Sequence, residues 1–268
     1  MTAGVQARPY VVELFGLPGA GKSTVARQLL TRLPYAGARP LLATAISAPD
    51  VPAPIRLSRK ALLVVGNVLD DRRAARAIWQ ATKGDRLGRR DAMHRMVQWH
   101  VTERLMTQAA RRPGTTILDE GYVQCLWSVC LSGDRERWLE LYGSKRRPVP
   151  DVLVALRVSP ALAAERLSER RSTHSRVQSL ADEALLRQLV HGDALADDLL
   201  GWWSAYRGSP RRTVEVDADA TPHDVTSAVL RALPADVTGL PSSSDCEGHD
   251  PQGSRTNRSD GSGPAAAH

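Results

Sequence analysis

Short apolar segments alternate with amphipathic ones along most of the chain. The first apolar segment, residues 10–15 (YVVELF), is rich in β-branched and aromatic residues and ends at glycines, and residues 22–33 have the spacing of a helix. Further strand-like segments lie at residues 40–46, 115–118, 152–158 and 213–216, and helical patterns cover residues 161–171, 184–207 and 222–232. Strands that alternate with helices predict an α/β fold in which helices cover both faces of a parallel sheet.

A long stretch without strand pattern separates the second and third apolar segments. Between residues 57 and 111, apolar residues recur at spacings of three and four, with charges between them. We interpret residues 48–112 as an insertion of two or three helices within one domain that spans residues 1–234. From residue 235 onward Ser, Gly, Asp, Pro and Asn dominate without an apolar period, so we expect residues 235–268 to form a disordered acidic tail.

Composition and charge narrow the class of protein. The chain has 268 residues, of which 42% are hydrophobic and 24% charged, as in a soluble globular protein. It has no apolar run long enough for a bilayer and no signal-peptide pattern at its start, so we expect a cytoplasmic protein without membrane contact. The net charge is +7, and residues 56–112 alone hold fourteen Lys and Arg against five Asp and Glu. This excess favours either an anionic small molecule or a solvated helix surface, and the scarcity of interleaved aromatic residues disfavours nucleic acid.

Residues 16–23 (GLPGAGKS) match the phosphate-binding pattern G-x-x-x-x-G-K-[ST] at every fixed position, between a predicted strand and a predicted helix. Glycines let the backbone turn its N–H groups inward, and the positive end of the following helix faces the same point. The pattern therefore predicts a site for ATP and Mg²⁺, with Lys22 as a catalytic residue and Ser23 as a metal ligand. The residues expected to hold the nucleotide are Gly16, Gly19, Ala20, Gly21, Lys22, Ser23 and Thr24.

Two acidic residues, Asp119 and Glu120, follow the third predicted strand. Ligands of doubly wound sheets bind at the carboxyl ends of strands, so both carboxylates face the phosphate loop if this strand lies beside the first. Asp119 could hold Mg²⁺ through water or accept the proton of an attacking hydroxyl, and Glu120 could accept that proton or bind substrate. A solvated pair or a helix cap is the alternative. With a phosphate loop in the same chain, we predict a catalytic and metal-binding role for Asp119 and leave the role of Glu120 open.

Arginines crowd the end of the helix predicted at residues 161–171. Arg166 and Arg170 are four residues apart, which places both on one helix face. Cations aimed at the transferred phosphoryl group stabilise the charge that develops on it. We predict that Arg166 or Arg170 is catalytic, on a flap formed by residues 165–178. Neighbouring glutamates leave open an ordinary charged helix face.

Three segments together resemble a known group of enzymes. The loop GLPGAGKST, the apolar strand that ends in the acidic pair, and PDVLVALRVSPALAAERLSERR with its basic continuation are similar, in this order, to P-loop kinases of the thymidylate kinase and deoxynucleoside kinase group. The likeness extends over most of residues 10–234. It implies a three-layer fold with a five-stranded parallel sheet in the order 2-3-1-4-5, an insertion that binds the acceptor, and a flap that closes over ATP.

The same resemblance assigns roles to individual residues. It implies that Lys22 and Ser23 match the residues for nucleotide and Mg²⁺, and that Asp119 matches the acidic residue of the D-R or E-R-S signature. Arg166 or Arg170 would match the flap arginines. The R-E-P-G stretch of thymidylate kinases has no counterpart here, and Arg157 stands where their L-D-V stretch is acidic, so thymidylate as acceptor does not follow.

These observations predict an ATP-dependent kinase that transfers the γ-phosphate to a small molecule. The acceptor would be a nucleoside, a nucleotide or a similar compound with a hydroxyl or phosphate group. Two other classes of function remain open. One is a switch or motor NTPase, in which Asp119 holds Mg²⁺ and Glu120 activates water, and the other is an ATP-binding regulator without turnover. The oligomeric state is left open by the sequence.

Overall fold

Five parallel strands form the centre of the molecule. The computed structural model describes residues 8–33, 41–42, 53–84, 89–131, 133–144, 147–169, 182–206, 212–234 and 237. Within them the strand order is β2-β3-β1-β4-β5, which confirms the predicted α/β fold and its sheet order. The strands are β1 (Pro9–Gly16), β2 (Leu41–Leu42), β3 (Gly114–Leu118), β4 (Val152–Arg157) and β5 (Arg212–Asp217).

The central position of β1 follows from its composition. Its residues from Val11 to Gly16 are buried, as expected for a strand that helices cover on both faces. Val12 is in register with Ile117 of β3 on one side and with Val152 of β4 on the other. Because all three strands run in the same direction, their carboxyl ends meet at one edge of the sheet, where the glycine-rich loop begins.

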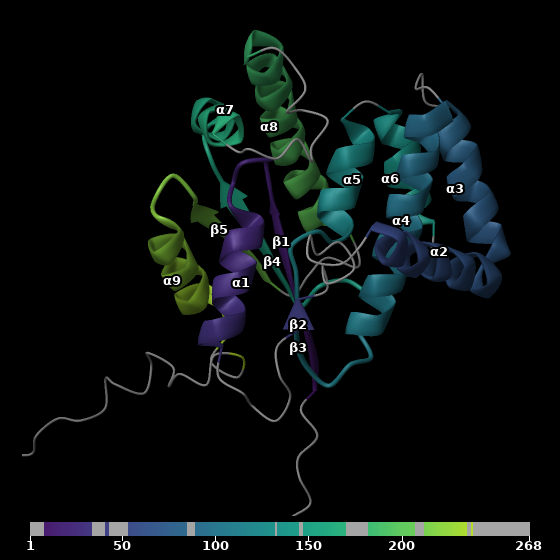
Figure 1. Ribbon diagram of the computed structural model, residues 1–268, viewed down its shortest axis with the longest axis horizontal. Helices are drawn as coiled ribbons and strands as arrows, with labels where there is room; N and C mark the ends of the chain where they lie inside the picture. Colours follow the sequence, from purple (N-terminus) through teal and green to yellow (C-terminus); the bar gives the residue numbers. More distant parts are fainter. Residues whose placement is uncertain are drawn as a thin grey trace, which may run out of the picture.

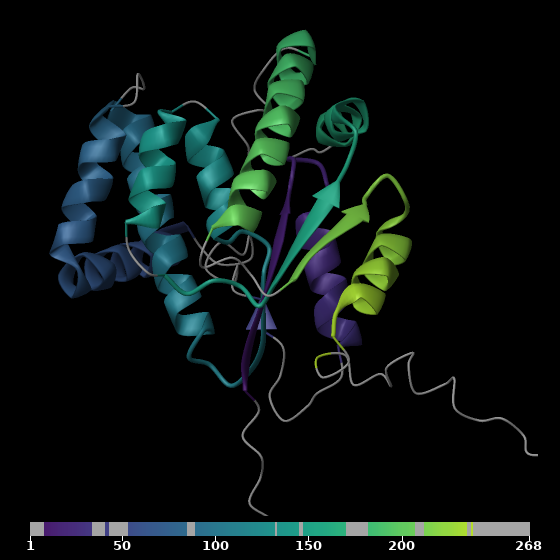
Figure 2. The same cartoon turned by 180° about the vertical axis from the view of Figure 1, so that it is seen from behind.

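Helices form a layer on each face of the sheet, so the three-layer prediction is confirmed (Figures 1 and 2). One layer contains α1 (Lys22–Arg32) and α9 (Pro222–Ala232), which pack against each other. The other contains α4 (Arg89–Ala109), α5 (Tyr122–Cys130) and α8 (Asp182–Ala205). Helix α7 (Pro160–Ser168) packs against α8, and α6 (Arg135–Gly143) lies beside α5.

The predicted helical insertion is present as α2 (Ala53–Asp70), α3 (Arg72–Gly84) and α4. Both views place α2 and α3 farthest from the sheet (Figures 1 and 2). Helix α4 connects them to the sheet, since it packs against α2 and α3 on one side and against α5 on the other. None of the helices in the described ranges is long and apolar enough to cross a bilayer.

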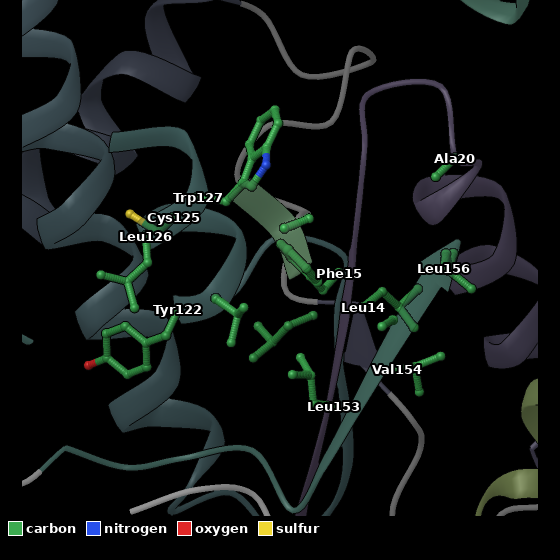
Figure 3. Packing of buried hydrophobic residues seen from close by; sticks show 14 of the residues in the cluster. Leu14, Phe15, Ala20, Tyr122, Cys125, Leu126, Trp127, Leu153, Val154 and Leu156 are labelled. Atoms are coloured by element: carbon green, nitrogen blue, oxygen red, sulfur yellow. The ribbon is translucent and has the colours of Figure 1, made fainter. Parts of the chain in front are cut away.

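The hydrophobic core lies on both faces of β1 and β4. Figure 3 shows Tyr122, Leu126 and Trp127 of α5 on one side of these strands, and Ala20 with Leu156 on the other. All five side chains are buried. Packing of this kind anchors both the strand before the glycine-rich loop and the helix after β3.

Several expectations differ from the structure or fall beyond it. Helices α5 and α6 lie where no helix is predicted from the sequence pattern. The second strand is described only at residues 41–42, and residues 43–50 lie outside the described ranges, as do residues 170–178 of the predicted flap and 238–268 of the predicted tail. Val237, three residues past the expected domain boundary, is buried against the core.

Candidate functional site

The glycine-rich loop lies tightly against β4 and α7. Gly16 has a φ of +153°, and a Cβ at this position would lie 2.5 Å from the carbonyl oxygen of Leu156. Gly19 has a φ of +92°, and a Cβ there would lie 2.7 Å from the carbonyl oxygen of Ala163. A side chain at either position would displace backbone, so only glycine fits at both turns.

Lys22 and the start of α1 provide the positive charge of the site. Helix α1 begins after Gly21, which has a φ of +84° and no side chain with which to cap the helix. A helix start of this kind is a ready anion site. The Lys22 ammonium donates hydrogen bonds to the carbonyl oxygens of Gly16 (2.6 Å) and Leu17 (3.0 Å), which places its charge over the loop.

Ser23 and Asp119 meet across the carboxyl ends of β1 and β3. The Ser23 hydroxyl donates a hydrogen bond of 3.0 Å to Oδ2 of Asp119, although 96 positions separate the two residues. The Asp119 side chain is only 5% exposed. Carboxylate and hydroxyl oxygens are ligands that suit Mg²⁺. Within the described ranges no group of three or more His, Cys, Asp or Glu residues could hold a metal, so a metal here would complete its shell with phosphate and water.

Glu120 lies between the loop and the insertion. Its carboxylate accepts a hydrogen bond of 3.3 Å from the Gln98 side chain of α4. Glu120 is exposed to solvent, and neighbouring protein atoms partly desolvate its carboxyl group. This desolvation raises its pKa, the Asp119 carboxylate raises it further, and Lys22 and Lys60 oppose the change. The groups that act on the Glu120 carboxyl group therefore include Lys22 of α1, Lys60 of α2 and Gln98 of α4.

The structure describes only one of the two predicted flap arginines. Arg166 donates hydrogen bonds to the carbonyl oxygens of Ala218 (2.8 Å) and Asp219 (3.3 Å), so it ties α7 to the loop after β5. Arg170 lies outside the described residues. Because Ala163 on the same helix touches Gly19, α7 is nevertheless adjacent to the glycine-rich loop.

A buried carboxyl group that the sequence prediction missed lies behind the site. Glu13 of β1 is fully buried, and its Oε1 accepts hydrogen bonds from the backbone N–H groups of Val123 (2.7 Å) and Gln124 (3.2 Å). Burial raises the pKa of Glu13 to about 7, although its hydrogen bonds to backbone N–H groups lower it. The Gln124 side chain in turn accepts a hydrogen bond of 3.3 Å from the N–H of Gly16. The only sign of this buried group in the sequence is a charged residue within an otherwise apolar strand.

Replacing Glu13 by glutamine is expected to stabilise the protein at neutral and alkaline pH. The folded state keeps the Glu13 proton up to a pKa of about 7, whereas its ordinary value is 4.5, so wild-type stability falls as the pH rises between these values. Glutamine does not titrate. The difference in unfolding free energy should therefore grow in favour of E13Q across this window and reach about 3 kcal/mol above pH 7. Urea unfolding of both proteins from pH 4.5 to 8 measures it, and a constant difference would contradict the assignment.

Comparisons with known proteins agree with this geometry. A family model described as an AAA domain matches residues 11–192. The structure of deoxyadenosine kinase from M. mycoides with products dCMP and a flexible dCDP has a TM-score of 0.53 and 15% identity, over 83% of this chain and 97% of that chain. The dATP-bound structure of the same kinase gives 0.49 and 14%, over 83% and 98%. No curated protein matches the chain. At such identities, a likeness in structure establishes a shared fold.

Proposed function

Since the chain belongs to the AAA domain family and has the fold of a P-loop nucleoside kinase, we propose that it is an ATP- and Mg²⁺-dependent phosphotransferase. It transfers the γ-phosphate to a small-molecule acceptor, a nucleoside, a nucleotide or a similar hydroxyl or phosphate compound. The observation that carries this proposal is the Ser23–Asp119 hydrogen bond of 3.0 Å beside the glycine-rich loop. In this proposal the hydroxyl and the carboxylate lie beside the phosphates that Lys22 binds.

Each residue of the site has a role in this proposal. Lys22 exchanges the carbonyl oxygens of Gly16 and Leu17 for β- and γ-phosphate oxygens when ATP binds. Ser23 and Asp119 would hold Mg²⁺, which neutralises the charge that the β- and γ-phosphates share. Where the acceptor is a hydroxyl, the Asp119 carboxylate can also take its proton.

An arginine completes the charge balance at the γ-phosphate. The guanidinium of Arg166 is engaged with the carbonyl oxygens of Ala218 and Asp219. We therefore assign this role to Arg170, four residues later, and give Arg166 the role of holding α7 against the loop after β5. Closure of residues 165–178 would then exclude water and limit hydrolysis of ATP.

The surface between Glu120 and the insertion is the proposed acceptor site. Gln98 of α4 donates a hydrogen bond to Glu120, and Lys60 of α2 lowers the Glu120 pKa, so side chains of the insertion face the carboxyl end of β3. Amide, carboxylate and ammonium groups near one another suit an acceptor with hydroxyl or phosphate groups. The M. mycoides kinase, which shares this fold, holds dCMP and dCDP, and this supports an acceptor of the nucleoside class.

Glu120 also supports a second candidate, an NTPase that hydrolyses ATP without an acceptor. Its raised pKa suits a proton acceptor for an attacking water, and Asp119 beside it would then serve Mg²⁺ alone. The hydrogen bond from Gln98 directs Glu120 toward the insertion, which favours contact with an acceptor.

A screen for phosphate transfer tests the function directly. The full chain is incubated with MgATP and a panel of nucleosides, nucleoside monophosphates, sugars and antibiotic alcohols, and mass spectrometry detects an acceptor that gains one phosphate. We expect one class to be phosphorylated, with ATP consumption at least about tenfold slower when no acceptor is present. Equal consumption without acceptor would identify the NTPase, and MgATP binding without consumption would identify a regulator.

A further inference from the structure

Strand β1 and the first turn of α5 are joined in both directions. Glu13 of β1 accepts hydrogen bonds from the N–H groups of Val123 and Gln124, and Gln124 accepts one from Gly16 at the end of β1. We call these four residues the β1–α5 bridge. Three hydrogen bonds between 2.7 and 3.3 Å make it up, and all are buried. One side of the bridge therefore ends at the first residue of the phosphate loop.

The other side of the bridge ends at the acidic pair. Residues 119–121 connect β3 to α5, and Gly121 precedes the helix without a side-chain cap. Glu13 satisfies N–H groups of the first turn of α5 from a neighbouring strand, a role that a side chain at the helix start usually has. A Cβ at Gly121 would lie 2.5 Å from Oε2 of Glu13, so the connection is packed directly against this carboxyl group.

A carboxyl group at this place is costly, because burial disfavours its charged form. The titratable groups that face it are Tyr122 and Cys125 of α5 and Tyr142 of α6, and burial raises the pKa of all three. They stay neutral near pH 7, and none offers Glu13 a positive charge. Helices are usually capped by a short polar side chain at their own start, and Gly121 supplies none to α5. We therefore look for the reason for the buried Glu13 carboxyl group in the residues that it holds in place, on either side of the β1–α5 bridge.

We propose that Glu13 is a positioning residue, which acts through the start of α5 to hold Asp119 against Ser23 while Gln124 fixes the N–H of Gly16. The bridge sets the spacing between the phosphate loop and the metal-binding carboxylate before a nucleotide arrives. A site fixed in advance loses less entropy when ligands bind. This inference rests on the proposed function, because it needs Asp119 to contribute to Mg²⁺ binding.

Coupling between ATP and Mg²⁺ binding tests this role. Calorimetry gives the ATP affinity with Mg²⁺ and with EDTA, and the ratio of the two measures the contribution of the metal. In Glu13→Ala we expect this ratio to fall by about tenfold or more, as when groups that orient metal ligands are lost, with the EDTA affinity changed less than about twofold. Glu13→Gln should keep the ratio, because its amide oxygen can accept the same two N–H bonds.

A double-mutant cycle shows whether Glu13 acts through Asp119. Asp119→Asn alone should lower the same ratio, and Glu13→Ala added to it should lower the ratio no further. Additive losses would overturn the proposal, as would an unchanged ratio in Glu13→Ala. An equal loss with Mg²⁺ and with EDTA would also overturn it, because that result indicates general damage to the loop.

Two further variants keep the test decisive. Thr116→Val is the matched control, because Thr116 is buried in β3 and its hydroxyl oxygen makes no hydrogen bond within the described residues. It should leave the ratio unchanged.

If Glu13→Ala does not fold, Gly121→Ala takes its place, since the added Cβ displaces the Glu13 carboxyl group. Hydrogen exchange at Val123 and Gln124 should then increase. Unchanged exchange and an unchanged ratio would refute the role. Failure of wild type to bind ATP under either condition would instead remove the proposed function.

Discussion

Lys22→Ala should abolish MgATP binding at concentrations that saturate the wild type, and phosphate transfer with it. In the structure the ammonium lies over the loop and donates two hydrogen bonds of 2.6 and 3.0 Å to the loop carbonyls. In the proposed complex it makes the equivalent bonds to two phosphate oxygens. Charge-assisted bonds of this kind contribute about 1.5–3 kcal/mol each, so the affinity should fall by about 100-fold or more. Calorimetry with MgATP measures the loss.

Arg27→Ala is the matched control for the change in charge. Arg27 lies on the same helix as Lys22, is exposed and is not part of the loop. Like Lys22→Ala, the Arg27→Ala change removes one positive charge, so it reports how far net charge alone affects ATP binding. We expect an affinity within about threefold of wild type at physiological ionic strength. Binding of MgATP by Lys22→Ala with wild-type affinity would show that the loop does not hold the phosphates.

Local sequence signals explain why the sheet and the loop could be predicted. The strands β1 and β4 are short apolar runs, and the glycines, Lys22 and Ser23 of the loop occur at fixed spacing, so each is recognisable without knowledge of the rest of the fold. The position of Asp119 needed one more step, the adjacency of β3 and β1. The resemblance implied that adjacency, and the strand register confirms it.

Helix α5 could not be predicted in the same way, because it has almost no polar face. Eight of its nine residues are buried, so the hydrophobic period of a surface helix is missing from its sequence. The elements that pack around it are β1, α4, α6 and α8, of which β1 and α8 are far from it in the chain. A helix surrounded by protein is recognised from its neighbours, and these are known only once the fold is known.

Other residues have partners that are far away in the sequence, and this explains why their roles could not be assigned from the sequence. Glu13 and Val123 are 110 positions apart, and nothing near either residue indicates the partner. Arg157, which departs from the acidic residue of thymidylate kinases, forms ion pairs with Asp197 of α8 and Glu215 of β5. Its charge therefore joins the edge of the sheet to α8.

Asp119→Asn should lower the rate of phosphate transfer by about 100-fold or more, while ATP still binds. Asparagine preserves the shape of the side chain, and its amide oxygen can still accept the Ser23 hydrogen bond of 3.0 Å. It loses the negative charge that holds Mg²⁺ and cannot accept a proton from the acceptor. Steady-state kinetics with the acceptor from the screen gives the rate, and calorimetry with EDTA shows that metal-free ATP affinity is retained.

Glu120→Gln separates the two carboxylates of the pair. A kinase in which Asp119 holds the metal or takes the proton should keep its transfer rate within about tenfold in this variant, with the larger change in the KM of the acceptor, because Glu120 faces the insertion beside Gln98. An NTPase that relies on Glu120 to activate water would instead lose hydrolysis in Glu120→Gln. Asp119 and Glu120 are adjacent, so the variant with the larger loss of rate identifies the proton acceptor. A loss confined to Glu120→Gln would give that role to Glu120 and leave Asp119 without one.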